Sequence, residues 1–375
     1  IRTIEVNKFD SIRPYTDNEV NEVLLDLSNN RRFLKMLFAN GEYSYLRLLP
    51  FSRKILGFIL RNKVKSIHDV QSYQNFFESI VNNVVENSIK NFTVNGIENL
   101  NPNTGYLFVS NHRDITLDSA LLNLTLHKNN LGTTNNAVGN NLLSEKWASD
   151  LMRLNKSFII DRSDKSKREI YQSLNLASEF IWDSISNKNE SVWIAQKQGR
   201  SKDGNDFTDP SVIKMIHLNA RKKMSVDKYL NSLKVVPVSI SYEKDPNDIT
   251  KATELYLTDL NSEYIKDSKE DLKSISDGIR GHKGDVNLNI GEVMHFNNDS
   301  YDDCSVKITE TIKQSYKNHA TNYAAAILQG KNFAANEFTN EEIDDAITYL
   351  NKRMEQISGD VEPYFLQQYS NSVIS

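Results

Sequence analysis

The sequence is poor in cysteine and in long apolar runs, and each shortage excludes a class of protein. Its single cysteine, Cys304, leaves no partner for an internal disulfide and rules out a cysteine-based metal cluster, which is typical of the reducing cytoplasm. The longest apolar stretches, such as residues 55–60, fall far short of the roughly 20 residues that cross a bilayer. The first ten residues lack the apolar core of a signal peptide. We therefore expect neither a membrane span nor a secretion signal.

The sequence also lacks a strong excess of one charge and the common motifs for nucleotide and metal binding. The net charge of −4 is too small to imply binding to nucleic acid. No Walker-type glycine-lysine pattern is present, so nucleotide binding is unsupported. None of the seven histidines belongs to an H-E-x-x-H or similar ligand spacing, which argues against a metal hydrolase. We expect no metal and no other cofactor.

What the chain does have is length and a soluble composition. It has 375 residues, 39% of them hydrophobic and 25% charged, with a mean hydropathy of −0.53. That length exceeds the usual single domain and can bury a substantial core. We expect one catalytic domain with helical additions at both ends.

Residues 1–91 are predicted to be mostly helical and contain a basic, apolar segment at 43–65. The segment has many leucine, isoleucine and phenylalanine residues and no acidic residue. Such a segment can lie in the interface of an anionic membrane. It can equally be a buried helix whose long basic side chains reach solvent. Its basic residues are Arg47, Arg53, Lys54, Arg61, Lys63 and Lys65.

Short β-like runs then alternate with helical segments. The runs at 92–96, 106–111, 191–196, 234–241 and 285–291 have strand lengths and are rich in β-branched or aromatic residues. Residues 118–128 and 165–186 have helical patterns, with Asp118 as a plausible N-cap. Pro237 predicts an edge strand or a bulge. This alternation predicts an α/β domain over 92–298, with a central mixed sheet flanked by helices.

Residues 299–375 are predicted to be helical again. Thr339 and Glu342 form a capping-box pattern, and apolar residues follow at helical spacing. We expect that apolar stripe to be packing surface.

The segment at 109–123 is the first that could carry chemistry. A strand-like run ends at Asn111, His112 follows in a turn, and Asp114 and Asp118 precede or open a helix. A histidine at a strand end is well placed for proton abstraction if a carboxylate fixes its tautomer. The alternatives are a structural histidine and an aspartate that only caps the helix.

The segment at 194–210 is the second. It follows another predicted strand and places Lys197, Arg200 and Lys202 around Gly199 and Gly204. Glycine lets backbone N–H groups approach an anion, and arginine offers two parallel donors to a phosphate. The alternative is a polar surface loop.

Two further segments carry weaker signals: the apolar run at 156–162, which ends in arginine, and the predicted strand around Pro237. In their order along the chain, the four segments resemble the four motif blocks of the glycerol-phosphate and lysophospholipid acyltransferase family, over residues 105–240. The family pattern has four residues between its histidine and aspartate, whereas five separate His112 from Asp118 here. It usually has glutamate where this chain has Gln198, which keeps a hydrogen-bonding oxygen but no negative charge. The blocks correspond to Asn111-His112…Asp118, Phe158-Ile159-Ile160-Asp161-Arg162, Gln198-Gly199-Arg200-Ser201 and Val236-Pro237-Val238.

The resemblance implies roles for these residues. His112 would be the catalytic base, with Asp118, or else Asp114, supporting it. Asn111 and Gly199 would position groups or stabilise the oxyanion. The substrate-binding set would be Arg162, Gln198, Gly199, Arg200, Ser201 and Lys202.

The resemblance also implies a reaction. A fatty acyl group would pass from acyl-CoA or acyl-carrier protein to a hydroxyl of a lysophospholipid such as 1-acylglycerol-3-phosphate. The wording of the blocks is similar to a bacterial branch that includes enzymes acylating amino-acid lipids. No covalent acyl-enzyme is expected, because there is no G-x-S-x-G elbow and Cys304 is far from the blocks in sequence. We expect a cytoplasmic protein that can attach peripherally, through 43–65, to the inner face of the cytoplasmic membrane. The competing hypotheses are a thioesterase and a non-catalytic protein that binds lipid or acyl-carrier protein.

Overall fold

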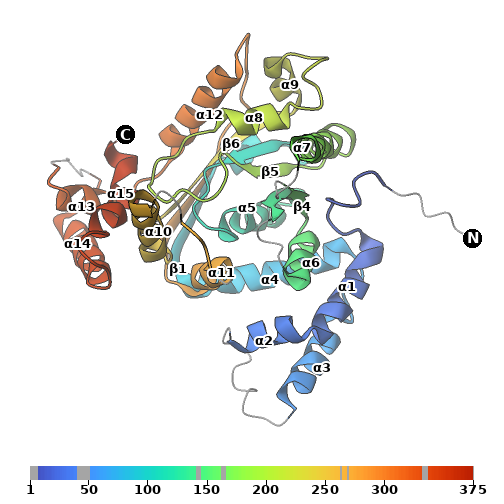
Figure 1. Ribbon diagram of the computed structural model, residues 1–375, viewed down its shortest axis with the longest axis horizontal. Helices are drawn as coiled ribbons and strands as arrows, with labels where there is room; N and C mark the ends of the chain where they lie inside the picture. The colour runs from blue at the N-terminus through green and yellow to red at the C-terminus, as the bar shows by residue number, and fades with distance from the viewer. Residues whose placement is uncertain are drawn as a thin grey trace, which may run out of the picture.

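The computed structural model describes residues 7–39, 51–140, 145–161, 166–261, 264–267, 270–331 and 337–374. These residues form a mixed seven-stranded sheet in the order β1-β7-β6-β2-β5-β3-β4. All neighbouring strands are parallel except β6 and β7, which are antiparallel. The predicted α/β fold with a mixed sheet flanked by helices is confirmed (Figure 1). The strands are β1(Ile89–Asn95), β2(Leu107–Ser110), β3(Asn135–Gly139), β4(Ser157–Ile160), β5(Val192–Ala195), β6(Val235–Tyr242) and β7(Gly284–Ile290).

The helices lie on both faces of this sheet and in two clusters beyond it. Their bounds are α1(Asp17–Asn29), α2(Arg31–Ala39), α3(Ser52–Val64), α4(Val70–Ser88), α5(Leu117–Lys128), α6(Lys146–Leu154), α7(Lys167–Trp182), α8(Pro210–Ile216), α9(Val226–Ser232), α10(Asp248–Asn261), α11(Glu270–Arg280), α12(Tyr301–Ser315), α13(Ala320–Leu328), α14(Asn340–Met354) and α15(Glu362–Ile374).

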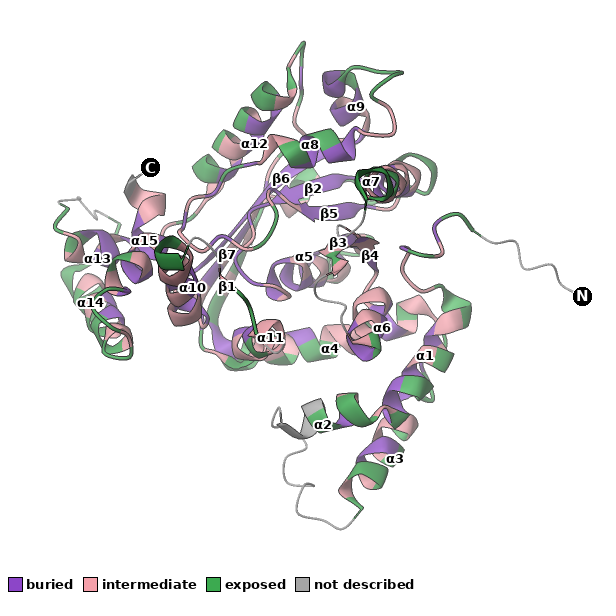
Figure 2. Ribbon diagram, in the orientation of Figure 1, coloured by how far each residue is buried: buried purple, intermediate pink, exposed green. Residues whose placement is uncertain are grey.

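Two apolar cores sandwich the sheet. One core joins the strands to α7, α8, α9 and α12, and the other joins them to α4 and α5. Figure 2 shows the strands largely buried and the outer faces of these helices exposed. Every residue of β6 is buried, because β6 lies between two neighbouring strands and is covered on both faces.

Two smaller cores hold the terminal helices. One lies among α1, α3, α4 and α6, and the other among α10, α13, α14 and α15. In Figure 1, α1 and α3 of the first cluster project at the lower right, and α13, α14 and α15 of the second lie at the left. The capping box of α14 forms as predicted: Glu342 N–H donates to the Thr339 hydroxyl, and Thr339 N–H donates to the Glu342 carboxylate.

The prediction that Pro237 marks an edge strand or a bulge is wrong. Pro237 lies in β6, between β2 and β7, and pairs with Val109 of β2. The β6–β7 ladder includes Val238, which pairs with Ile290, but does not include Pro237. The N–H that proline lacks is therefore not needed for this ladder. Gly291 leaves room for the ring, since a Cβ there would lie 2.7 Å from Pro237 Cγ.

Half of the basic, apolar segment lies in α3, and residues 43–50 of it lie outside the described residues. The side chains of Leu56 and Val64 pack inward. Phe58 is 59% exposed and Phe51, just before the helix, is 76% exposed. The described half is therefore not a fully buried helix. Within the described ranges, no helix is long and apolar enough to cross a membrane.

Candidate functional site

The carboxyl ends of β2, β5 and β6 meet at one edge of the sheet because these strands are parallel. His112 follows β2, and the loop 196–209 follows β5. Ligands of open α/β sheets bind beyond such ends. The main chain already joins the two loops here, because Ser201 N–H donates to the His112 carbonyl oxygen at 2.7 Å. Arg162, predicted from the block after β4, lies outside the described residues.

The imidazole of His112 is held by Asp118. The distance between His112 Nδ1 and Asp118 Oδ2 is 2.8 Å. The same oxygen accepts the backbone N–H groups of Arg113 (2.6 Å) and Asp114 (3.0 Å). These two bonds fold the turn back on the carboxylate, and the fifth intervening residue is accommodated in this way. The histidine side chain remains 14% exposed while that of Asp118 is 1% exposed.

Asp118 is not the N-cap of α5. It lies inside the helix, which begins at Leu117, and its carboxylate turns toward His112 instead. Asp114 instead accepts hydrogen bonds at the start of α5: its Oδ1 accepts the N–H groups of Thr116 and Leu117, both at 2.9 Å. Burial, and then the charge of Asp118, raise the pKa of Asp114. The two candidate carboxylates therefore have different partners, and only Asp118 contacts the imidazole.

Asn111 is fully buried and ties β2 to β6. Its side chain donates to the Ile240 carbonyl at 3.0 Å and accepts the Ile240 N–H at 2.8 Å. It also donates to Asp206, which in turn accepts from the guanidinium of Arg113 at 2.6 Å. These contacts fix the chain on both sides of His112.

The loop after β5 presents its polar groups at different depths. Gly199 is exposed, with a φ of +75° that favours glycine, and no atom of the described residues lies within 4 Å of where its Cβ would be. Arg200 Nη2 makes a long contact of 3.5 Å to Ser274 of α11, and its buried Nη1 has no partner among the described residues. Lys202 is paired with Glu254 of α10 at 2.5 Å. Gln198 is exposed and Ser201 is buried.

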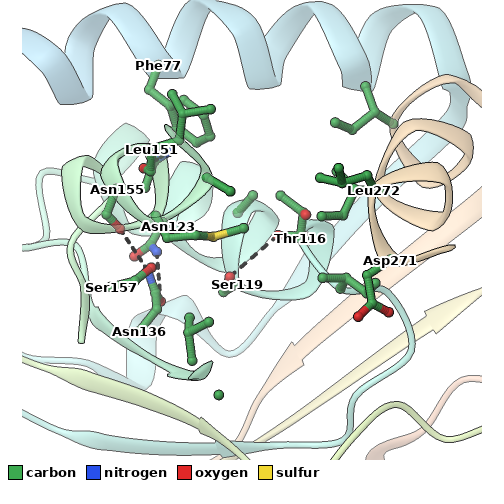
Figure 3. A pocket seen from close by; sticks show the side chains of 18 of the residues that line it. Phe77, Thr116, Ser119, Asn123, Asn136, Leu151, Asn155, Ser157, Asp271 and Leu272 are labelled. Atoms are coloured by element: carbon green, nitrogen blue, oxygen red, sulfur yellow. Dashed lines mark hydrogen bonds between the residues drawn. The ribbon is translucent and has the colours of Figure 1, made fainter. Parts of the chain in front are cut away.

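A large apolar cavity opens beside His112. Its volume is about 1350 Å³, above the roughly 300–1,000 Å³ of common ligand pockets. His112 and Arg200 both line it, as do Gln198, Gly199 and Lys202. Its apolar walls come from α4, α5, α6 and α11; Figure 3 shows Phe77 of α4 and Leu272 of α11 among its lining residues. The sequence-predicted base and anion-binding arginine thus line a common cavity.

A small polar patch interrupts this apolar wall. Asn123 of α5 donates to Asn136 of β3 at 3.3 Å, and Asn136 donates to the Asn155 carbonyl at 3.1 Å (Figure 3). Asn123 and Thr134 also hydrogen bond, so the patch joins α5 to the start of β3. No pattern in the sequence predicted it, because its members come from separate elements.

Residues 91–241 match the family model described as Acyltransferase. This segment is similar to the acyltransferase family, in agreement with the resemblance of the four motif blocks. The match spans β1 to β6 and contains His112, Asp118 and the loop after β5.

A solved structure is also similar. It is that of the 1-acyl-sn-glycerophosphate acyltransferase PlsC from Thermotoga maritima, with 14% sequence identity and a TM-score of 0.39. The match covers 80% of this chain and 95% of that one. This likeness is too distant to carry over any residue. A search of curated proteins finds no match.

Proposed function

We propose that the protein transfers a fatty acyl group from acyl-CoA or acyl-carrier protein to a hydroxyl of a lysophospholipid or a related lipid, including an amino-acid lipid. The observation that carries this proposal is the His112–Asp118 pair at the wall of an apolar cavity that Arg200 also lines. A base with a fixed tautomer, an apolar volume and a cation are what this transfer requires.

His112 would act through Nε2. Its Nδ1 is engaged by Asp118, and within the described part of the chain no hydrogen-bond partner occupies Nε2. Nε2 takes the proton from the acceptor hydroxyl as that oxygen attacks the thioester carbonyl carbon. The tetrahedral intermediate then collapses, the carbon–sulfur bond breaks, and the thiolate receives the proton from the imidazolium. Asp118 stabilises the imidazolium throughout, as the acid of a catalytic triad does.

The loop after β5 would bind the charged parts of the substrates. The open backbone at Gly199 suits an N–H donor to the oxyanion. Arg200, with Arg162, would hold the phosphate or carboxylate of the acceptor. Gln198 would contribute a hydrogen bond without charge. Ser201 and Lys202, which are tied to His112 and to Glu254, would hold the loop in place, and Asn111 would hold the turn.

The exposed face of α3 would bring the protein to the membrane where its lipids lie. Phe51 and Phe58 are exposed there beside Lys54, whose ammonium lies 5.7 Å from the Phe51 ring. Aromatic residues next to cations suit the surface of an anionic bilayer. We propose peripheral attachment through this face.

The test is incubation of the purified protein with palmitoyl-CoA and lysophosphatidic acid or an N-acyl amino acid bearing a hydroxyl. Formation of the new ester supports the proposal. His112→Ala should abolish it, while His127→Ala, a change at a histidine paired with Glu78 at the far end of α5, should not. Release of free fatty acid regardless of acceptor would favour a thioesterase instead. Ester formation that survives His112→Ala would remove the base assignment.

A further inference from the structure

We infer that Tyr242 is a positioning residue for the His112–Asp118 pair, and this inference rests on the proposed function. Tyr242 ends β6, and its hydroxyl donates to Asp118 Oδ1 at 2.8 Å. Both residues are buried, with 8% of Tyr242 and 2% of Asp118 exposed. No motif block contains Tyr242, which lies just beyond the matched family segment.

The two oxygens of Asp118 are not equally supported. Oδ2 receives three donors, namely His112 Nδ1 and the N–H groups of Arg113 and Asp114. Oδ1 receives only the Tyr242 hydroxyl among the described residues. A buried carboxylate oxygen without a donor is costly, so the Tyr242 hydroxyl both holds Oδ1 in place and takes up part of the carboxylate charge. Without this hydroxyl, more of the charge of Asp118 would act on the imidazole through Oδ2.

The fold explains why this tyrosine is available. β6 lies beside β2, with Ser110 opposite Val238, so the strand continues past the His112 turn and ends at Tyr242. Tyr242 is also fixed from the other side, where it pairs with Val286 of β7. Strand β6, which contains the fourth motif block, therefore contributes to the site by placing the Tyr242 hydroxyl within hydrogen-bond distance of the Asp118 carboxylate.

The charges around Tyr242 keep it a donor. Burial comes first, and the carboxylates of Asp118, Asp114 and Asp245 add to it in raising the pKa of Tyr242 well above 10.0. The hydroxyl therefore stays protonated at neutral pH. The hydrogen bond from Tyr242 stabilises part of the negative charge of Asp118. The carboxylate therefore stabilises an imidazolium at His112 less than it would without this bond.

The experiment compares Tyr242→Phe with Tyr229→Phe. The matched control also removes one buried hydroxyl, which donates to the neutral Asn219 at 2.9 Å in the layer of α9. The imidazole resonances of His112 are followed by NMR against pH, a readout that needs no substrate. In Tyr242→Phe the midpoint should move to higher pH by roughly half a unit to one unit, and ester formation should fall roughly tenfold. In Tyr229→Phe neither should change.

A second substitution predicts the opposite sign. Replacing Tyr242 with 3-fluorotyrosine makes the phenol a stronger donor, so the His112 midpoint should move to lower pH. This variant keeps the hydroxyl and remains informative if Tyr242→Phe folds poorly. Midpoints in both Tyr242 variants equal to that of the unaltered protein would overturn the inference. Such a result, with His112→Ala still inactive, would leave the proposed function standing; activity in His112→Ala would remove the function itself.

Discussion

At the scale of single residues, two aspartates four positions apart have opposite surroundings. Asp118 receives the imidazole, while Asp114 receives the first N–H groups of α5 and lies against Gly278 of α11. The proposed function gives only Asp118 a part in proton transfer.

We therefore predict different kinetics for Asp118→Asn and Asp114→Asn. An amide at 118 can favour the wrong imidazole tautomer, so kcat should fall by about 10³–10⁴. An amide oxygen at 114 still accepts from Thr116 and Leu117, so kcat should change less than about tenfold. Steady-state ester formation measures both, with thermal unfolding to check the fold. Equal losses in the two variants would contradict this assignment.

At the scale of elements, the position of α11 depends on a glycine. A Cβ built on Gly278 would overlap the carboxylate of Asp114, so α11 approaches the turn after β2 closely. This helix also contacts α4 and lines the cavity through Leu272, Ile275 and Ile279.

Gly278→Ala should therefore destabilise the protein, although alanine is favoured over glycine inside a helix by about 1 kcal/mol. Overpacking costs about 1–3 kcal/mol, which should exceed that gain. Urea unfolding measures the difference, with Gly132→Ala as the control because no atom in the described part of the chain lies within 4 Å of its Cβ position. A stabilised Gly278→Ala protein would show that α11 moves away freely.

The elements also show where sequence reasoning succeeds. The capping box of α14 and the strands at β1, β2, β5, β6 and β7 follow from local patterns. β3 was missed because its strand begins with Asn135 and Asn136 and is only five residues long. β4 is four residues long with only three apolar residues in a row, and so short a run has no period that distinguishes a strand from another piece of core.

Some residues of the candidate site can likewise be predicted from the sequence, and others cannot. His112 and Arg200 were found because each follows a strand in a short recognisable segment. The bond from Tyr242 to Asp118 joins residues 124 positions apart, and no local pattern encodes it. The place of Pro237 inside the sheet depends likewise on Gly291 and on the strand order, which the sequence does not display.

At the scale of the whole molecule, the helical additions interlock with the α/β part. We propose the division into 1–91, 92–298 and 299–375. Yet α6 completes the core of the first region and α10 completes the core of the last, although both come from the middle. The buried Asp248 of α10 accepts from Arg353 and Tyr369 and so ties the last region down.

The exposed face of α3 leads to a prediction for membrane attachment. Phe58→Ser should weaken binding to vesicles containing phosphatidylglycerol by about tenfold to a hundredfold, since burial of a phenylalanine contributes about 1.5–3 kcal/mol. Val306→Ser on α12 is the control, because Val306 is also exposed but belongs to the helix layer on the other face. Vesicle co-sedimentation measures both, and added salt should release the unaltered protein. Equal binding by the two variants would exclude this face.

The pairing of β1 with β7 has a consequence for how the chain is made. Asn91 and Asp285, whose side chains hydrogen bond across this pair, are 194 residues apart. At roughly 5–20 residues per second, β1 leaves the ribosome on the order of 10–40 s before its neighbour exists. During that interval it is an unpaired edge, exposed to other chains. A protein cut after residue 241 would retain all four motif blocks and still never close this sheet, because the strand that completes it is translated later.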